Sequence, residues 1–277
     1  MVDLAEKARE IRVEIIRMLR KAESGHSAGA LGAADLFACL YFGELLNFRC
    51  KEPYWEERDR LVLSCGHYAP VWYASLALAG FFPMEELMTL RKLGSRLQGH
   101  PVRVASTSYT AHKQLPGVEN TGGPLGQGVS IAVGMALAAK RDKKKWKTVC
   151  ICSDAEQQEG QTWEAYQTAS KYDLGNLWFV IDRNEIQISG NVHEVMPIEP
   201  LVEKLKAFGL RVIEVDGNDI DQIIMAFEKG KLFPDEPKVI VMRTVAGKGV
   251  SFMERDFRWH GKAPTDEESE KALWELK

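Results

Sequence analysis

Apolar residues recur with helical spacing in several parts of this chain. In the N-terminal segment they form one stripe, opposed by a face of glutamate and arginine, which is typical of an amphipathic helix. This stripe lies within residues 3–22 and comprises Leu4, Ala8, Ile11, Ile15 and Leu19. Similar patterns predict further helices over residues 33–46, 70–82 and 129–141.

After residue 146, short apolar runs alternate with helical segments. Buried strands are predicted over residues 147–154, 176–182, 210–216 and 237–244. The helices between them are predicted over residues 159–173, 201–209 and 221–230. This alternation predicts a mainly parallel sheet with helices on both faces, which is a three-layer α/β/α sandwich. Because no linker rich in Pro, Ser or Gly interrupts the chain, we expect a single domain over residues 1–277.

Residues 94–128 interrupt the periodic pattern. This segment has no clear period and is rich in Gly, Pro, Thr and Ser. A long segment without secondary structure inside a compact domain usually serves a function. We therefore expect part of it to contribute to a binding site.

Composition and charge exclude several classes of function. The 277 residues are 45% hydrophobic and 27% charged, which is ordinary for a globular protein. A net charge of −3 gives no electrostatic basis for binding nucleic acid or an anionic membrane. No apolar stretch approaches the ~18 residues of a membrane span. The N-terminus lacks an apolar signal core, and the five cysteines include no C-x-x-C pair, so we expect a cytoplasmic protein with reduced thiols.

Two polar residues follow consecutive predicted strands. Asp154 ends one strand and Asn184 follows the next, so both side chains should reach the same edge of the sheet. A carboxylate and an amide oxygen, with a backbone carbonyl and phosphate oxygens, would complete a Mg²⁺ shell. The helix that begins near Glu159 would present free N–H groups to the same place. On spacing alone, a helix-capping Asp and a turn Asn remain the alternative interpretation.

The sequence around these residues resembles the transketolase family. Residues 153–190 are similar to the thiamine diphosphate signature of that family nearly end to end. Further similarity, in order along the chain, covers residues 24–42, 58–80, 99–101, 120–140 and 247–264. The resemblance implies an enzyme that moves a two-carbon ketol unit from a ketose phosphate to an aldose phosphate. It would use thiamine diphosphate and Mg²⁺, or another divalent cation such as Ca²⁺ or Mn²⁺.

The same resemblance implies roles for individual residues. It makes Asp154, Asn184 and the backbone carbonyl of Ile186 the metal ligands. The cofactor-binding positions that it implies are Asp154, Asn184, His67, Gly123, Pro124, Leu125, Ala155, Ile188 and His260. Leu125 and Ile188 would hold the cofactor in a bent form. Bending brings its pyrimidine amino nitrogen within proton-transfer reach of the thiazolium carbon.

Four of the six histidines adjoin a glycine and match active-site positions of the family. The resemblance implies contacts with the reacting hydroxyl and carbonyl oxygens for His26, His100 and His260. Imidazole suits this role because its pKa lies near neutrality. His67 would mainly contact the diphosphate. A structural or surface role is expected for the remaining two, His112 and His193.

Glu159 allows two interpretations, which are compatible. It is placed as an acid in the first turn of a helix, where the helix dipole favours negative charge. The resemblance instead implies a catalytic role in a carboxylate network at a subunit boundary.

The chain departs from the family at the start of the signature, where Ser153-Asp154-Ala155 replaces Gly-Asp-Gly. If position 155 requires a positive φ, alanine there costs about 1 kcal/mol. If the position requires only close approach of the phosphate, one methyl group can be tolerated. Weaker cofactor binding is the expected consequence. On this hypothesis, Ala155→Gly would tighten binding by up to about tenfold.

The resemblance also implies a second chain. Transketolases continue into a pyrimidine-binding domain and a C-terminal domain that have no counterpart here. This chain therefore resembles the N-terminal subunit of a split transketolase, expected in an α2β2 heterotetramer with a C-terminal, pyrimidine-binding subunit. Two alternatives remain: the same chemistry on a sulfonated or branched ketose, and a non-catalytic subunit with a degraded cofactor site.

Overall fold

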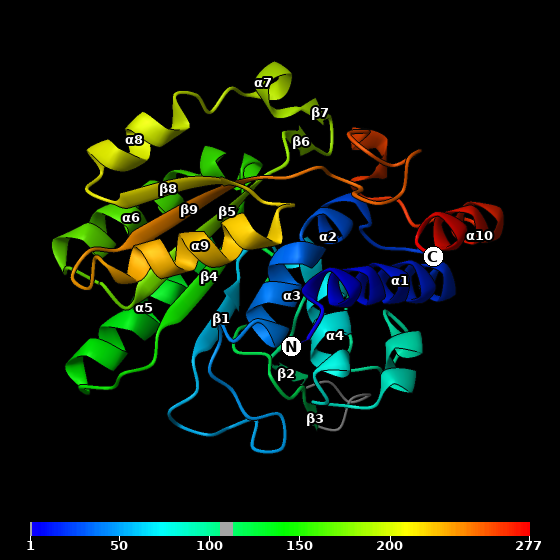
Figure 1. The fold of residues 1–277 in the computed structure, drawn as a ribbon, viewed down its shortest axis with the longest axis horizontal. Coiled ribbons are helices and arrows are strands. Elements are labelled where there is room, and N and C mark those ends of the chain that lie inside the picture. The colour runs from blue at the N-terminus through cyan, green and yellow to red at the C-terminus, as the bar shows by residue number, and fades with distance from the viewer. Residues whose placement is uncertain (1, 106–112) are drawn as a thin grey trace.

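A five-stranded parallel sheet forms the centre of the protein. The computed structural model describes residues 2–105 and 113–277, so His112 lies outside the described residues. The strand order is β1-β4-β5-β9-β8, and each neighbouring pair is parallel (Figure 1). The strands are β1 Arg60–Leu63, β4 Thr148–Ser153, β5 Leu177–Arg183, β8 Arg211–Asp216 and β9 Lys238–Arg243. The predicted parallel sheet is confirmed.

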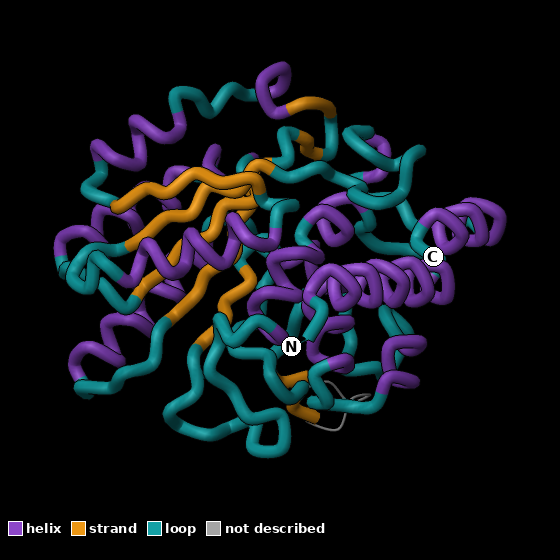
Figure 2. Tube along the Cα trace, in the orientation of Figure 1, coloured by secondary structure: helices purple, strands orange, loops and turns teal. Residues whose placement is uncertain are grey.

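Helices cover both faces of this sheet, as predicted (Figures 1 and 2). One layer contains α5 Gln127–Arg141, α6 Gly160–Lys171 and α8 Leu201–Ala207. The other contains α1 Leu4–Ala22, α2 Ala28–Gly32, α3 Ala34–Phe42, α4 Ala69–Leu78 and α9 Ile220–Lys231, with α10 Asp266–Glu275 packed against α1. The three-layer α/β/α architecture is therefore confirmed.

The strands are apolar on both faces because both faces are covered. Along β5, Phe179 and Ile181 pack into the core beneath α5 and α6, whereas Trp178 and Val180 pack into the core on the opposite face. This alternation explains why the strand reads as a continuous apolar run in the sequence. Within residues 2–105 and 113–277, no helix is both long and apolar enough to cross a membrane.

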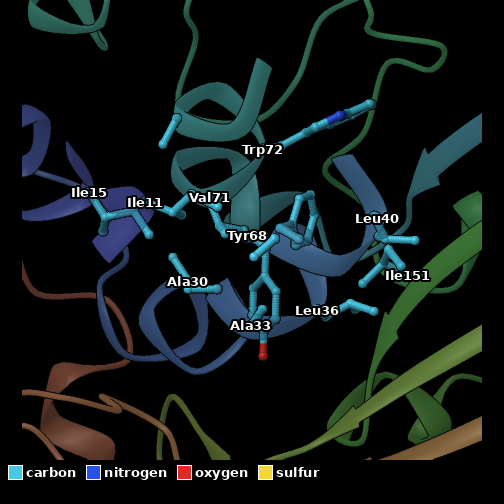
Figure 3. Close-up of a cluster of buried hydrophobic side chains, with 14 of the residues drawn as sticks. Ile11, Ile15, Ala30, Ala33, Leu36, Leu40, Tyr68, Val71, Trp72 and Ile151 are labelled. Atoms are coloured by element: carbon cyan, nitrogen blue, oxygen red, sulfur yellow. The ribbon is translucent and has the colours of Figure 1, made fainter. Parts of the chain in front are cut away.

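The helical layer of α1 to α4 has its own apolar core. Figure 3 shows Trp72 and Val71 of α4 near Leu36 and Leu40 of α3, with the Tyr68 ring among them. The hydroxyl end of Tyr68 is turned away from Trp72 in this view. Tyr68 therefore contributes an apolar ring to the core and a polar tip to another part of the structure.

Short elements occupy the connections. They include the strands β2 Val104–Ala105, β3 Lys113–Gln114, β6 Ile186–Gln187 and β7 Gly190–Asn191, and the helix α7 Val192–Val195. Single 3-10 turns span Gly66–Tyr68, Met84–Thr89, Ala155–Gln158 and Phe257–Trp259. The sequence patterns did not predict the antiparallel β6–β7 pair or the short strand β1, although they predicted the long helices and the other four strands of the sheet.

A buried ion pair connects this helical layer to the edge of the sheet. The Arg12 guanidinium lies 2.6 Å from Asp35 Oδ2, and its Nε donates to the Leu31 carbonyl. Asn218, in the turn after β8, donates to the same Asp35 carboxylate at 2.7 Å. Both charged side chains are almost fully buried.

We expect Asp35→Ala to lower the free energy of unfolding by about 3 kcal/mol, because it leaves the Arg12 guanidinium buried without a counter-charge. Glu228→Ala is the matched control, since it removes an exposed pair with Lys231 at 2.6 Å. The control should change stability by less than about 0.5 kcal/mol. Urea unfolding followed by circular dichroism measures both, and equal effects of the two variants would contradict the expectation.

Candidate active site

A cavity of about 400 Å³ opens where β4 and β5 end. Its walls come from loops far apart in the sequence, as expected for a site at the carboxyl edge of a parallel sheet. The lining residues are His26, His67, Tyr68, His100, Gly123, Leu125, Ser153, Ala155, Gln158, Glu159, Asn184, Ile186, Gln187, Ile188, Ser189 and His260. Every residue that the sequence predicted for the site lines this cavity, except Pro124 and Asp154.

Asp154 lies directly behind the cavity wall. Its side chain is 0% exposed, and its two carboxylate oxygens accept hydrogen bonds from the backbone N–H groups of Ala155 at 2.7 Å and Glu185 at 2.6 Å. Burial and the nearby Asp182 carboxylate raise the pKa of Asp154 to about 7, against the opposing effect of the two N–H donors. A cation beside this carboxylate would offset the cost of burying its charge.

A hydrogen-bond network fixes the orientation of Asn184. Its amide nitrogen donates to Tyr68 Oη at 2.7 Å and to Asp182 Oδ2 at 2.9 Å. Asp182 is buried and also accepts from the hydroxyls of Tyr68 and Thr244, so it requires donors around it. The amide oxygen of Asn184 is therefore turned the other way, toward the backbone of Ile186 in the cavity wall.

The donor set fits a divalent cation that brings anionic ligands with it. In the described part of the chain, no three or more His, Cys, Asp or Glu side chains cluster as metal ligands. One buried carboxylate, one oriented amide oxygen and nearby backbone carbonyls are present instead. Mg²⁺ is typically bound by one or two carboxylates together with the phosphates of its ligand.

Four histidines converge in the cavity. The His26 ring centroid lies 5.4 Å from His67, 5.8 Å from His100 and 5.6 Å from His260. His67 and His260 are 4.9 Å apart. Each comes from a different loop, so the convergence arises only in the folded chain. His193, by contrast, is exposed on α7 and lies outside this cavity.

Burial keeps these imidazoles uncharged at neutral pH. It lowers the pKa of His26 to about 4, with a further contribution from its histidine neighbours and Arg91. Burial and the same neighbours lower the pKa of His67 well below its ordinary value, and burial also lowers those of His100 and His260. His26 Nδ1 is buried and has no hydrogen-bond partner among the described residues. The cluster can therefore accept protons and hydrogen bonds from a polyhydroxylated ligand.

Specific contacts hold the histidine loops together. Ser27 Oγ donates to the carbonyls of Trp259 at 3.1 Å and Lys262 at 2.7 Å, which ties the His26 loop to the His260 loop. At Gly66, beside His67, a Cβ atom would lie 2.8 Å from the Gly123 nitrogen. Only glycine allows this close approach of two backbone segments.

The glycine-rich loop before α5 forms another wall of the cavity. Gly123 has a φ of 151°, which disfavours any side chain, although a Cβ there would meet no atom within 4 Å. Leu125 O accepts from Gln161 Nε2 at 2.9 Å, so the loop is joined to α6. Ile188, from the β6–β7 connection, is 76% exposed and also lines the cavity.

The backbone at position 155 decides between the two effects expected of alanine there. Ala155 is not among the described non-glycine residues with positive φ, and Asp154 has ordinary helical angles of −65° and −45°. The hypothesis that alanine strains this turn is therefore wrong. Of the two explanations for weaker cofactor binding, only crowding of the phosphate by the methyl group remains.

Glu159 occupies the N-cap position of α6, but its side chain makes no capping hydrogen bond. Its exposed carboxylate lines the cavity instead. Sequence reasoning missed Tyr68, Asp182 and Ser153. The signal for Asp182 was a carboxylate in an apolar run two residues before Asn184, where only tertiary structure decides whether it is buried.

Relatives of known family match the chain along its length. The family model for the thiamine diphosphate binding domain of transketolase matches residues 4–275. One of the two apulose-4-phosphate transketolase subunits of Phocaeicola vulgatus is 38% identical over 272 residues, covering 98% of this chain and 92% of that protein. The 6-deoxy-6-sulfo-D-fructose transketolase subunit SqwG of a Clostridium species is 39% identical over 275 residues, covering 99% of this chain and 96% of that protein.

Solved transketolases share the fold. The crystal structure from Campylobacter jejuni has a TM-score of 0.90 at 33% identity, covering 100% of this chain and 43% of that chain. The human transketolase is 34% identical over 274 residues, and the match covers 42% of that protein. This chain thus spans less than half of either protein, and nearly the full length of the Phocaeicola and Clostridium relatives. The family model and these relatives show that the chain belongs to the transketolase family, as its thiamine diphosphate binding domain.

Proposed function

We propose that this chain is the diphosphate-binding subunit of a two-chain transketolase. The pair would transfer a two-carbon ketol unit from a ketose phosphate to an aldose phosphate. One observation carries this proposal: a fully buried Asp154 and an outward-turned Asn184 amide oxygen lie at one end of a cavity lined by four uncharged histidines. This arrangement combines a place for a metal-bound diphosphate with proton acceptors for a sugar.

The metal ligands in this proposal are Asp154, the Asn184 amide oxygen and the Ile186 carbonyl. They would bind Mg²⁺, or Ca²⁺ or Mn²⁺ in its place, with the diphosphate completing the coordination. His67, His260 and the backbone at Ala155 would contact the diphosphate. Contacts with the rings of the cofactor are assigned to Gly123, Pro124, Leu125 and Ile188, all of which except Pro124 line the cavity.

When bound, thiamine diphosphate supplies the nucleophilic carbon that takes up and passes on the two-carbon unit. The residues of this chain orient the cofactor and move protons at the sugar. His26, His100 and His260 are uncharged, so each can accept a proton from a sugar hydroxyl and return it later. The buried, unpartnered Nδ1 of His26 supports a direct contact with substrate.

Surface features support a partner chain beside the cavity. Ile188 and Glu159 are exposed at its mouth, and the outer face of α5 exposes Ser130, Ile131 and Gly134. Small residues on a helix face allow close packing of another helix. We assign this face to a C-terminal, pyrimidine-binding subunit in an α2β2 heterotetramer, with Glu159 in a carboxylate network at the boundary.

The donor sugar is the least constrained part of the proposal. The Phocaeicola and Clostridium relatives carry names for different sugars, apulose 4-phosphate and 6-deoxy-6-sulfo-D-fructose. The histidines of this chain would contact hydroxyl and carbonyl groups common to ketoses, so the partner would select the sugar. The intact cavity and buried metal ligand do not favour a non-catalytic role.

We expect Asp154→Ala to abolish Mg²⁺-dependent binding of thiamine diphosphate by the assembled pair. The sequence suggested a rim residue outside the core, but the carboxylate is buried and accepts two backbone N–H groups. The variant should therefore also lose about 1–3 kcal/mol of stability while keeping its fold. Calorimetric titration and circular dichroism test this, with Asp142→Ala, an exposed site, as control. Unchanged affinity would refute the metal assignment.

We expect the purified chain alone to have no transketolase activity, even with saturating Mg²⁺ and thiamine diphosphate. It supplies the diphosphate site but has no counterpart of the pyrimidine-binding domain. Adding a separately purified pyrimidine-binding subunit should restore both cofactor retention and turnover, and several ketose donors should be assayed. Analytical ultracentrifugation of the mixture should show two copies of each chain. Substantial turnover without the second chain would refute the half-site proposal.

A further inference from the structure

Reciprocal hydrogen bonds enclose the turn that carries Asp154. Ser153 Oγ accepts from the backbone N–H of Glu156 at 3.3 Å, and Glu156 Oε2 accepts from the backbone N–H of Ser153 at 3.1 Å. The spacing and both bonds are those of a capping box, here around a 3-10 turn in place of an α-helix. Ser153, which replaces the glycine of the family signature, is thus a bonding partner in this turn.

The Glu156 carboxylate also reaches beyond the turn. Its Oε1 accepts from Gly126 N at 2.6 Å, at the end of the glycine-rich loop, and from the hydroxyl of Ser64 at the end of β1. The side chain is 0% exposed, so water does not compete for these bonds. One carboxylate therefore joins three segments of the cavity: the turn after β4, the loop with Leu125, and the turn with His67.

Further bonds restrict the same turn. Gln157 Nε2 donates to the Ser153 carbonyl at 2.9 Å, and the Asp154 N–H donates to the Asp182 carbonyl at 3.0 Å. The turn requires no positive φ at Asp154 or Ala155. Residues with a Cβ atom therefore fit here, and they reduce the conformational freedom that glycines would allow.

We propose that Ser153 and Glu156 are positioning residues that hold the Asp154 carboxylate and its turn in the binding geometry before the cofactor and metal arrive. The proposal rests on the proposed function, because it concerns binding at the same site. A turn that is ordered in advance loses less conformational entropy on binding, which increases affinity. The departure from Gly-Asp-Gly therefore strengthens cofactor binding, the reverse of what the sequence alone suggested.

The test measures thiamine diphosphate binding, in excess Mg²⁺, by the chain assembled with its partner. Ser153→Gly should weaken binding by about fivefold to tenfold, as expected for loss of a capping bond together with a more flexible turn. Glu156→Gln should weaken it at least as much, because its amide would face backbone N–H donors. The double variant should be no weaker than Glu156→Gln, since both changes break the same box. Turnover of Ser153→Gly at saturating cofactor should be unchanged, with only the apparent KM for the cofactor raised.

Thr265→Gly provides the matched control. Thr265 and Glu268 form the same kind of capping box ahead of α10, and neither residue lines the cavity. This variant should lower thermal stability but leave cofactor affinity unchanged. Equal affinity of Ser153→Gly and wild type, additive effects in the double variant, or reduced turnover at saturating cofactor would each overturn the proposal. A wild-type pair that binds no thiamine diphosphate would instead overturn the proposed function.

Discussion

The structure depends above all on the burial of three carboxylates where β4 and β5 end. Asp154, Glu156 and Asp182 are almost inaccessible to solvent, and each must be satisfied by donors because an unpaired buried charge costs several kcal/mol. The donors are backbone N–H groups for Asp154, N–H groups and a hydroxyl for Glu156, and hydroxyls and an amide for Asp182. The loops that form the cavity are placed by these bonds.

The same burial sets the electrostatics of the cavity. Burial raises the pKa of Asp182 and Glu156 and, together with Asp182, that of Asp154 to about 7. A raised folded-state pKa means that the Asp154 contribution to stability falls as pH rises from the ordinary carboxyl range toward 7. A divalent cation reverses this effect because it favours the ionised carboxylate. The uncharged histidines on the other walls add no positive charge that would compete with the cation.

Periodicity predicted the long elements, because their packing is recorded in local sequence. It could not predict β1, whose four residues are too few for a pattern, or β6 and β7, with two residues each. The convergence of four histidines came from the family resemblance alone, since their loops meet only through the sheet. Asp182 and Glu156 were missed because nothing local distinguishes a buried carboxylate from an exposed one. The backbone angles at Ala155 were likewise set by the fold.

The Ser-Asp-Ala turn is best understood together with the separation of the enzyme into two chains. With a glycine on each side of the aspartate, a turn retains freedom that must be lost when the diphosphate binds. Here Glu156 joins the turn to β1 and to the start of α5, so the turn becomes ordered when the sheet and its helices form. Its conformational entropy is then lost on folding and not on binding. For a subunit that we propose meets the other half of its site as a separate molecule, partner docking need not also order the metal ligand. Association and cofactor binding can then proceed in either order without a disordered intermediate at Asp154.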